Sequence, residues 1–114
     1  MHEASLAGGV LTVVEQAATR EQFRRVGTLR LEVGALAGVE LRALRFALEA
    51  IAPGTCLEGA RFEIDEPAGS AWCLDCNASV SIGSRTEDCP RCGGARLHPT
   101  GGTEIRVVDL IVHD

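Results

Sequence analysis

Four cysteines in two short pairs are the residues in this sequence best suited to chemistry. The first pair is Cys73 and Cys76 and the second is Cys89 and Cys92, with twelve residues between the pairs. Each C-x2-C pair can turn back and offer two thiolates to one ion, and this spacing is typical of a four-thiolate zinc site. Zinc with four thiolate ligands has no open coordination position. The pattern therefore predicts a structural metal site.

The first three residues can form a second metal site of a different kind. The α-amine of Met1, the amide and imidazole Nδ1 of His2, and the amide of Glu3 can surround one ion in a plane. Amide nitrogens coordinate only after losing a proton, which favours Ni(II) or Cu(II), ions that prefer square-planar geometry. The motif is short, and a second interpretation stays open. In that interpretation His2 is a polar residue ahead of a helix and Glu3 is an acid stabilised at the helix N-terminus.

Two helices are expected in the first half of the chain. Apolar residues recur with helical spacing from Ala4 to about Arg25 and again over 41–51. Gly8 and Gly9 weaken the first helix by about 1 kcal/mol each relative to alanine, so tertiary packing must compensate. Pro53 follows the second stripe and ends it.

Three strands are expected around these helices. Residues 28–33 and 61–65 alternate between apolar and polar side chains, which is typical of half-buried strands. A longer apolar run over 103–112 predicts a third strand. Its phase changes near Val107 and Val108, which indicates a bulge or burial on both faces.

The segment that holds the cysteines differs in composition from the rest of the chain. It is rich in Gly, Ser, Cys and Pro and poor in large apolar residues. We expect it to lack a core of its own and to depend on metal binding for its folding free energy. The element order predicts an α+β fold with two helices on a small three-stranded sheet and an inserted zinc-ribbon-like module. Residues 1–66 plus 103–114 would form the main domain and 67–102 the module.

Charge and composition narrow the class of protein. The formal net charge is -5 and all eleven basic residues are arginine. An acidic chain is a poor binder of phosphate backbones, so no nucleic-acid partner is expected. No apolar run of about 18 residues occurs and the start lacks a basic signal-peptide region, so no membrane association is expected. Zinc thiolates must stay reduced, which favours the cytoplasm.

Two other function classes fit part of this pattern. The cysteine spacing alone also suits a zinc-ribbon adaptor in transcription or RNA metabolism, but the negative charge and scarce aromatic residues disfavour it. A metalloenzyme would need an open metal position with a general acid or base. The saturated four-thiolate set supplies neither, and no Ser-His-Asp or paired-carboxylate arrangement is recognisable, so the chain is not expected to be an enzyme.

A series of short motifs extends along nearly the whole chain in a fixed order. They are Met1-His2-Glu3-Ala4-Ser5-Leu6, Arg30-Leu31-Glu32-Val33-Gly34, Gly38-Val39-Glu40, Leu44-Arg45-Phe46-Ala47, Gly54-Thr55, Leu57-Glu58-Gly59-Ala60 and the two cysteine pairs. In these motifs the chain resembles the HypA/HybF family. Its members are nickel metallochaperones for the maturation of nickel-iron hydrogenases and, in some organisms, of urease.

The resemblance implies a protein with two metal sites. Nickel, the transported ion, would be bound by His2 with backbone nitrogens of Met1 and Glu3. Zinc, the structural ion, would be held by Cys73, Cys76, Cys89 and Cys92. The implied partners are a hydrogenase-maturation nickel GTPase and the hydrogenase large subunit, with the chain itself a monomer or weak dimer. Whether the client is a hydrogenase or a urease stays open.

Three further residues carry groups that could have a role. His98 follows the second cysteine pair, and the resemblance allows it a role sensitive to pH or metal state, against a simpler role as a solvated loop residue. His113 matches no motif and is expected to be a tail residue. Cys56 has no C-x2-C partner and is expected to be a small buried hydrophobe.

Overall fold

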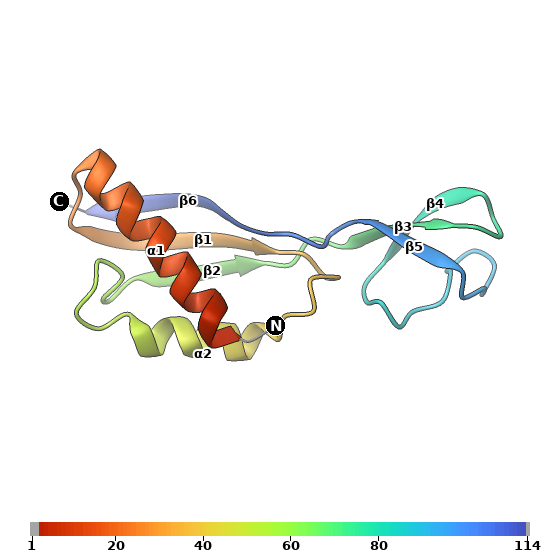
Figure 1. The fold of residues 1–114 in the computed structure, drawn as a ribbon, viewed down its shortest axis with the longest axis horizontal. Helices are drawn as coiled ribbons and strands as arrows, with labels where there is room; N and C mark the ends of the chain where they lie inside the picture. The colour runs from red at the N-terminus through yellow and green to blue at the C-terminus, as the bar shows by residue number, and fades with distance from the viewer. Residues whose placement is uncertain (1–2, 114) are drawn as a thin grey trace. The chain divides into compact units, whose positions relative to one another are not determined.

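The computed structural model of the chain describes residues 3–113, and the structural statements below refer to that range. The described residues form two three-stranded sheets, with strand orders β2-β1-β6 and β4-β3-β5 (Figure 1). The elements are α1 (Glu3–Glu21), β1 (Arg25–Val33), α2 (Leu41–Ile51), β2 (Arg61–Asp65), β3 (Gly69–Cys73), β4 (Ala78–Ile82), β5 (Leu97–Gly101) and β6 (Ile105–His113). This architecture confirms the predicted α+β fold with two helices and a four-cysteine module.

The chain divides into two compact units that are described separately. The first unit contains residues 1–31, 39–64 and 107–114, and the second contains 32–38 and 65–106. The second unit thus takes in the last two residues of β1 and the five that follow, which the sequence placed with the main domain. No helix within residues 3–113 has the length and apolar character needed to cross a membrane.

The core of the first unit follows from the alternation of β1. Leu29 and Leu31 are fully buried, as the period-two pattern predicts. Figure 1 shows α1 running across the strands of the β2-β1-β6 sheet. The buried side chains of the two helices and of β2 complete this core: Ala7, Val10, Val14, Leu44, Leu48 and Phe62. Burial of this many aliphatic side chains is what stabilises a unit with two glycines inside its longest helix.

The two helices begin beside each other. Glu40 is the N-cap of α2, and its Oε2 accepts a hydrogen bond of 2.7 Å from the amide of Ala43. The backbone N–H of Glu40 donates in turn to Oε2 of Glu3, at 3.3 Å. This hydrogen bond therefore joins Glu3, the first residue of α1, to Glu40, the N-cap of α2.

Helix α1 ends earlier than the sequence predicts. The apolar pattern suggested a helix to about Arg25, but α1 ends at Glu21 and Arg25 already begins β1. Gln22 adopts a left-handed conformation with φ of 57°, which a helix cannot continue through. The expected boundary was wrong because a periodic pattern does not reveal a non-glycine residue in this conformation.

The face of β1 that points away from the core carries ion pairs. Arg30 Nη1 lies 3.0 Å from Oδ2 of Asp109, and Arg106 Nε lies 2.8 Å from Oε1 of Glu32. Arg30 and Glu32 lie on the same face of β1, because they are two residues apart. Their partners, Asp109 and Arg106, therefore lie on the same face of β6, although these two are three residues apart. Strand β6 therefore changes phase between them, where the sequence indicated a bulge.

The second unit contains a small core that the sequence did not predict. Strand β3 pairs antiparallel with both β4 and β5. Leu36, from the segment between β1 and α2, packs against Cys73 and Cys89 together with Ala71, Val80 and Ile82. Residues 67–102 were expected to lack a core of their own, and the small core observed there is completed by Leu36, which comes from outside that segment.

Three stretches of chain meet closely where Leu36 enters this core. The amide of Leu36 donates to the carbonyl of Gly102 at 2.8 Å, and the amide of Gly34 donates to the carbonyl of Glu104, also at 2.8 Å. Arg85 Nε donates to the carbonyl oxygen of Leu36 at 2.9 Å. A Cβ atom at Gly34 would collide with the backbone of Gly102, so only glycine permits this approach.

Replacing Gly9 by alanine is expected to raise the free energy of unfolding by about 0.5–1 kcal/mol, because alanine loses less backbone entropy in a helix. A Cβ at Gly9 would meet no heavy atom within 4 Å outside the helix backbone. Urea unfolding followed by circular dichroism measures the change. Gly34→Ala is the matched control and should destabilise the protein. Loss of stability in Gly9→Ala would contradict the packing described for α1.

Candidate metal centre

The two cysteine pairs adopt the same local turn. The first lies at the end of β3, where the amide of Asn77 donates to the carbonyl of Cys73 at 2.8 Å. The second lies in the loop after β4, where the amide of Gly93 donates to the carbonyl of Cys89 at 2.8 Å. Asn77 and Gly93 both have positive φ, at 54° and 73°. These residue types tolerate that conformation, which closes each turn around its two sulfur atoms.

Backbone amides point at the sulfur atoms within each turn. The amides of Cys76 and Arg91 lie 3.4 Å from the Sγ atoms of Cys73 and Cys89, and the amide of Gly94 lies 3.4 Å from Sγ of Cys92. A thiolate accepts hydrogen bonds more strongly than a thiol because it carries a full charge. The turns are thus built to favour the charged form that binds metal.

The spacing of the four sulfur atoms fits one tetrahedral ion. Sγ of Cys73 lies 3.7 Å from Sγ of Cys92, and Sγ of Cys76 lies 3.8 Å from Sγ of Cys89. All four atoms lie within 4.8 Å of one another. A tetrahedron with metal–sulfur bonds of about 2.3 Å has sulfur–sulfur edges of about 3.8 Å. The donor set and its geometry therefore suit a closed four-thiolate zinc site.

The proton affinities of the thiols differ across the cluster. The backbone N–H groups of Cys92 and Arg91 lower the pKa of the Cys89 thiol to about 7. The side chain of Cys92, hydrogen-bonded to Cys76, does most to raise the pKa of Cys76 to about 12. Cys89 can therefore bind a metal ion as a thiolate at neutral pH, whereas Cys76 loses its proton only when the ion binds.

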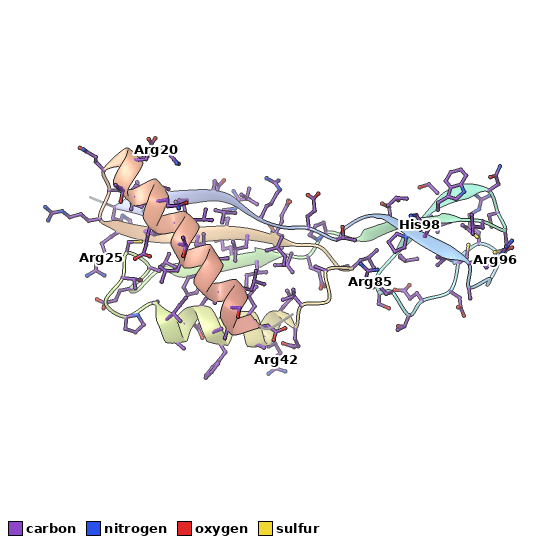
Figure 2. All side chains as sticks on the ribbon, in the orientation of Figure 1. Arg20, Arg25, Arg42, Arg85, Arg96 and His98 are labelled. Atoms are coloured by element: carbon purple, nitrogen blue, oxygen red, sulfur yellow. The ribbon has the colours of Figure 1, made fainter. Side chains whose placement is uncertain are left out.

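An arginine–aspartate pair joins the first turn to Arg96, the residue that precedes β5. Nε and Nη2 of Arg96 lie 3.0 and 2.6 Å from Oδ1 of Asp75, and the amide of Leu74 donates to the carbonyl of Arg96 at 3.0 Å. In Figure 2, Arg96 lies at the same end of the module as the sulfur atoms. The side chains are 65% and 41% exposed, so the pair adds little stability and serves mainly to orient the turn.

The residues predicted for the second site are only partly described. Met1 and His2 lie outside the described residues, so the structure does not place the predicted nickel ligand. Glu3 begins α1 and its carboxylate is fastened to Glu40 as described above. Within residues 3–113, Cys73, Cys76, Cys89 and Cys92 are the one group of metal-binding side chains that the fold gathers.

The other singled-out residues do not belong to the cysteine cluster. His98 is exposed but belongs to β5, opposite Trp72 of β3, and so is not a loop residue. His113 ends β6 and is not a tail residue. Cys56 is half-buried, and burial raises the pKa of its thiol. The sequence missed β5 because Leu97 is the one large aliphatic side chain in that strand, and it ended the last strand one residue early, at Val112.

Comparisons with known proteins agree on one family. Residues 1–112 match the family model described as "Hydrogenase/urease nickel incorporation, metallochaperone, hypA". The chain is 65% identical over 114 residues to hydrogenase maturation factor HypA of Cupriavidus necator, covering 100% of this chain and 96% of the relative. It is 50% identical over 112 residues to the factor of the same name in Azotobacter chroococcum, covering 98% and 99%.

A solved structure shares the fold. It is described as the solution structure of the Ni metallochaperone HypA from Helicobacter pylori and matches with a TM-score of 0.68. The match covers 98% of this chain and 97% of the other, at 19% sequence identity. At this identity the similarity establishes the fold alone.

Cys73→Ala is expected to abolish zinc binding and to unfold the second unit, because three thiolates leave the ion with an incomplete shell. Metal analysis and amide NMR spectra of the variant check this. Cys56→Ala is the control, since Cys56 lies outside the cluster and should leave zinc content unchanged. A second unit that stays ordered without metal in Cys73→Ala would show that the fold does not depend on the ion.

Zinc affinity is expected to increase with pH. Cys89, with a pKa of about 7, gains its proton as the pH falls below neutrality, and Cys76, with a pKa of about 12, always has a proton to release. Each displaced proton adds about tenfold to the affinity per pH unit, so the proton of Cys76 alone should raise the affinity about a hundredfold from about pH 6 to about pH 8, and that of Cys89 adds to this rise. Competition with a chromophoric chelator measures it, and a flat profile would contradict these protonation states of Cys76 and Cys89.

Proposed function

The chain belongs to the HypA family of nickel-incorporation metallochaperones, and from this premise we propose that it carries one Ni(II) ion on its N-terminal residues. His2 is the proposed side-chain ligand, with backbone nitrogens of Met1 and Glu3 completing the site. In the same proposal a zinc ion bound to the four cysteines is structural. The observation that carries the proposal is the family match from residue 1 onward, which includes Met1-His2-Glu3.

The chemistry of the first three residues supports nickel as the transported ion. An amine, ionised amides and an imidazole form a strong planar field, which Ni(II) accepts and Zn(II) does not prefer. The carboxylate of Glu3 accepts a hydrogen bond from the backbone N–H of Glu40 and adds negative charge next to the proposed ligands in the sequence. A cation would be attracted to this end of the unit.

The proposed nickel site also suits release of the ion to a partner protein. Its ligands come from consecutive residues at a chain end, so they can leave the ion one after another while a partner's ligands replace them. Binding removes protons from the amine and amides, so acid weakens the site. A carrier needs both tight binding and a stepwise route for transfer, and a terminal site offers both.

The zinc site supports this function indirectly. Its four thiolates would hold the second unit together and leave no position for a nickel ion. We assign residues 1–66 plus 103–114 to a nickel-binding domain and 67–102 to a zinc-binding module. The two compact units of the structure support this division in outline, with 32–38 grouped with the module.

The partners follow from the proposed role in maturation. The relatives at 65% and 50% identity are named hydrogenase maturation factors. A nickel GTPase and the hydrogenase large subunit are the proposed partners, and delivery would take place in the cytoplasm, where thiolates stay reduced. The chain would act as a carrier and not as an enzyme, since a saturated zinc site has no position for a substrate.

His2→Ala is expected to abolish stoichiometric Ni(II) binding and to leave zinc content unchanged, because the imidazole anchors the planar site. Isothermal titration of protein with a free amine at Met1 measures the nickel stoichiometry, and metal analysis measures zinc.

Two controls make this test specific. His98→Ala removes an exposed histidine of β5 and should bind nickel normally. One extra residue ahead of Met1 displaces the amine ligand and should weaken nickel binding without any change to His2. Full nickel affinity in His2→Ala would refute the assignment.

A further inference from the structure

The outer face of α2 carries an exposed apolar patch. Phe46 is 73% exposed and lies on the side of the helix opposite the buried Leu44 and Leu48. Ala50, one turn further along this face, and Pro53, just beyond the helix end, are exposed as well. A single exposed aromatic residue is ordinary, but a large side chain followed by small ones along one helical face is a surface against which another protein can pack.

An open hollow continues this patch beyond the end of α2. It has a volume of about 200 Å³. Its lining includes apolar and charged residues, among them Pro53, Phe62 and Glu49. Glu49 follows Phe46 by three residues and therefore lies on the same side of the helix. The exposed ring and the hollow are thus parts of one continuous surface.

Two charged side chains without a partner lie on this surface. Arg42 precedes Phe46 by one turn on the outer side of α2 (Figure 2), and Glu49 follows Phe46 by one turn. Within residues 3–113, neither of these charged side chains forms a hydrogen bond or an ion pair. Arg45 differs, since its Nη1 donates to the carbonyl oxygen of Phe62 at 2.7 Å. Arg42 and Glu49 are therefore free to pair with groups of another protein.

The beginning of α2 lies beside Glu3, one of the proposed nickel ligands. The backbone N–H of Glu40, the N-cap of α2, donates to Oε2 of Glu3 at 3.3 Å. Phe46 lies about 9 Å along the helix axis from that cap, at a rise of about 1.5 Å per residue. An ion passes directly between two proteins only when ligands of both can reach it, so a recipient must bind close to the carrier's site. The outer face of α2 meets this requirement.

We propose that this face of α2 is the docking surface for the protein that receives the nickel ion. The surface comprises Arg42, Phe46, Glu49, Ala50 and Pro53. The inference rests on the proposed function, in which the recipient is the hydrogenase large subunit. The matching surface of that protein presents apolar side chains to Phe46 and the hollow, an acidic group to Arg42 and a basic group to Glu49. Because the two charges on α2 have opposite signs, they also fix the direction in which the recipient binds.

Binding of the purified, nickel-free large subunit to the nickel-loaded full chain, measured by biolayer interferometry, tests the proposal. Phe46→Ser should raise the dissociation constant at least about tenfold, because the aromatic anchor at the centre of the surface is lost. Val13→Ser is the matched control, since Val13 is 50% exposed on α1 and its loss should leave binding unchanged. Thermal unfolding checks that both variants are folded.

Charge reversal tests the predicted complementarity. Arg42→Glu should lower the association rate about tenfold at low ionic strength, because repulsion of the recipient's acidic group replaces attraction. Added salt screens exposed charges, so the difference from the wild-type chain should become smaller as salt is added. Arg20→Glu, at an exposed arginine of α1, makes the same change in net charge and should associate as the wild-type chain does.

The outcomes separate this surface from the proposed function. Every variant should still bind one Ni(II) ion, since none of the changed residues is a proposed ligand. Wild-type binding that Phe46→Ser and Arg42→Glu leave unchanged would overturn the docking surface alone. If these variants lost binding to the purified nickel GTPase but kept binding to the large subunit, the choice of recipient would be wrong. A wild-type chain that binds nickel but not the large subunit would overturn both the surface and the recipient, while the nickel site would stand.

Discussion

The convergence of four sulfur atoms is the constraint on which the second unit depends. Two turns of the same geometry, closed by Asn77 and Gly93, bring thiols from separate parts of the chain within 4.8 Å of one another. Without an ion, four thiolates in this space would repel one another. An ion with a preference for four thiolates converts this arrangement into folding free energy. The sheet β4-β3-β5 and the packing of Leu36 are organised around that centre.

Much of this architecture was predictable because it rests on local patterns. Helix 41–51 has the predicted bounds, since a clear apolar stripe is followed by Pro53. The inward side of β1 and the pairing of the two cysteine motifs also follow from spacing alone. The role of Leu36 was not predictable, because its burial depends on an approach of Gly34 to Gly102 that only the folded chain reveals. The exposure of Phe46, at 73%, agrees with its place off the apolar stripe that contains Leu44 and Leu48.

The two proposed metal sites differ in how easily their ligands can exchange, as a structural ion and a transported ion require. The cysteine site is closed, supported by backbone amides at 3.4 Å and partly buried, which suits an ion that stays. The proposed nickel site would lie at the chain terminus, ahead of a helix whose first residue, Glu3, is fastened to Glu40. Ligands at a terminus can exchange without disturbing either core. Structural stability and transfer of the cargo are thereby assigned to separate parts of one small chain.

The central claim is that nickel and zinc occupy separate sites with different ligands. X-ray absorption spectra of one sample that contains both metals, recorded at the nickel and zinc edges, test it most directly. The protein must have a free amine at Met1. We expect a zinc spectrum with four sulfur neighbours at about 2.3 Å and a nickel spectrum with nitrogen or oxygen neighbours only. Sulfur neighbours around nickel, or zinc without its full set of four, would contradict the claim.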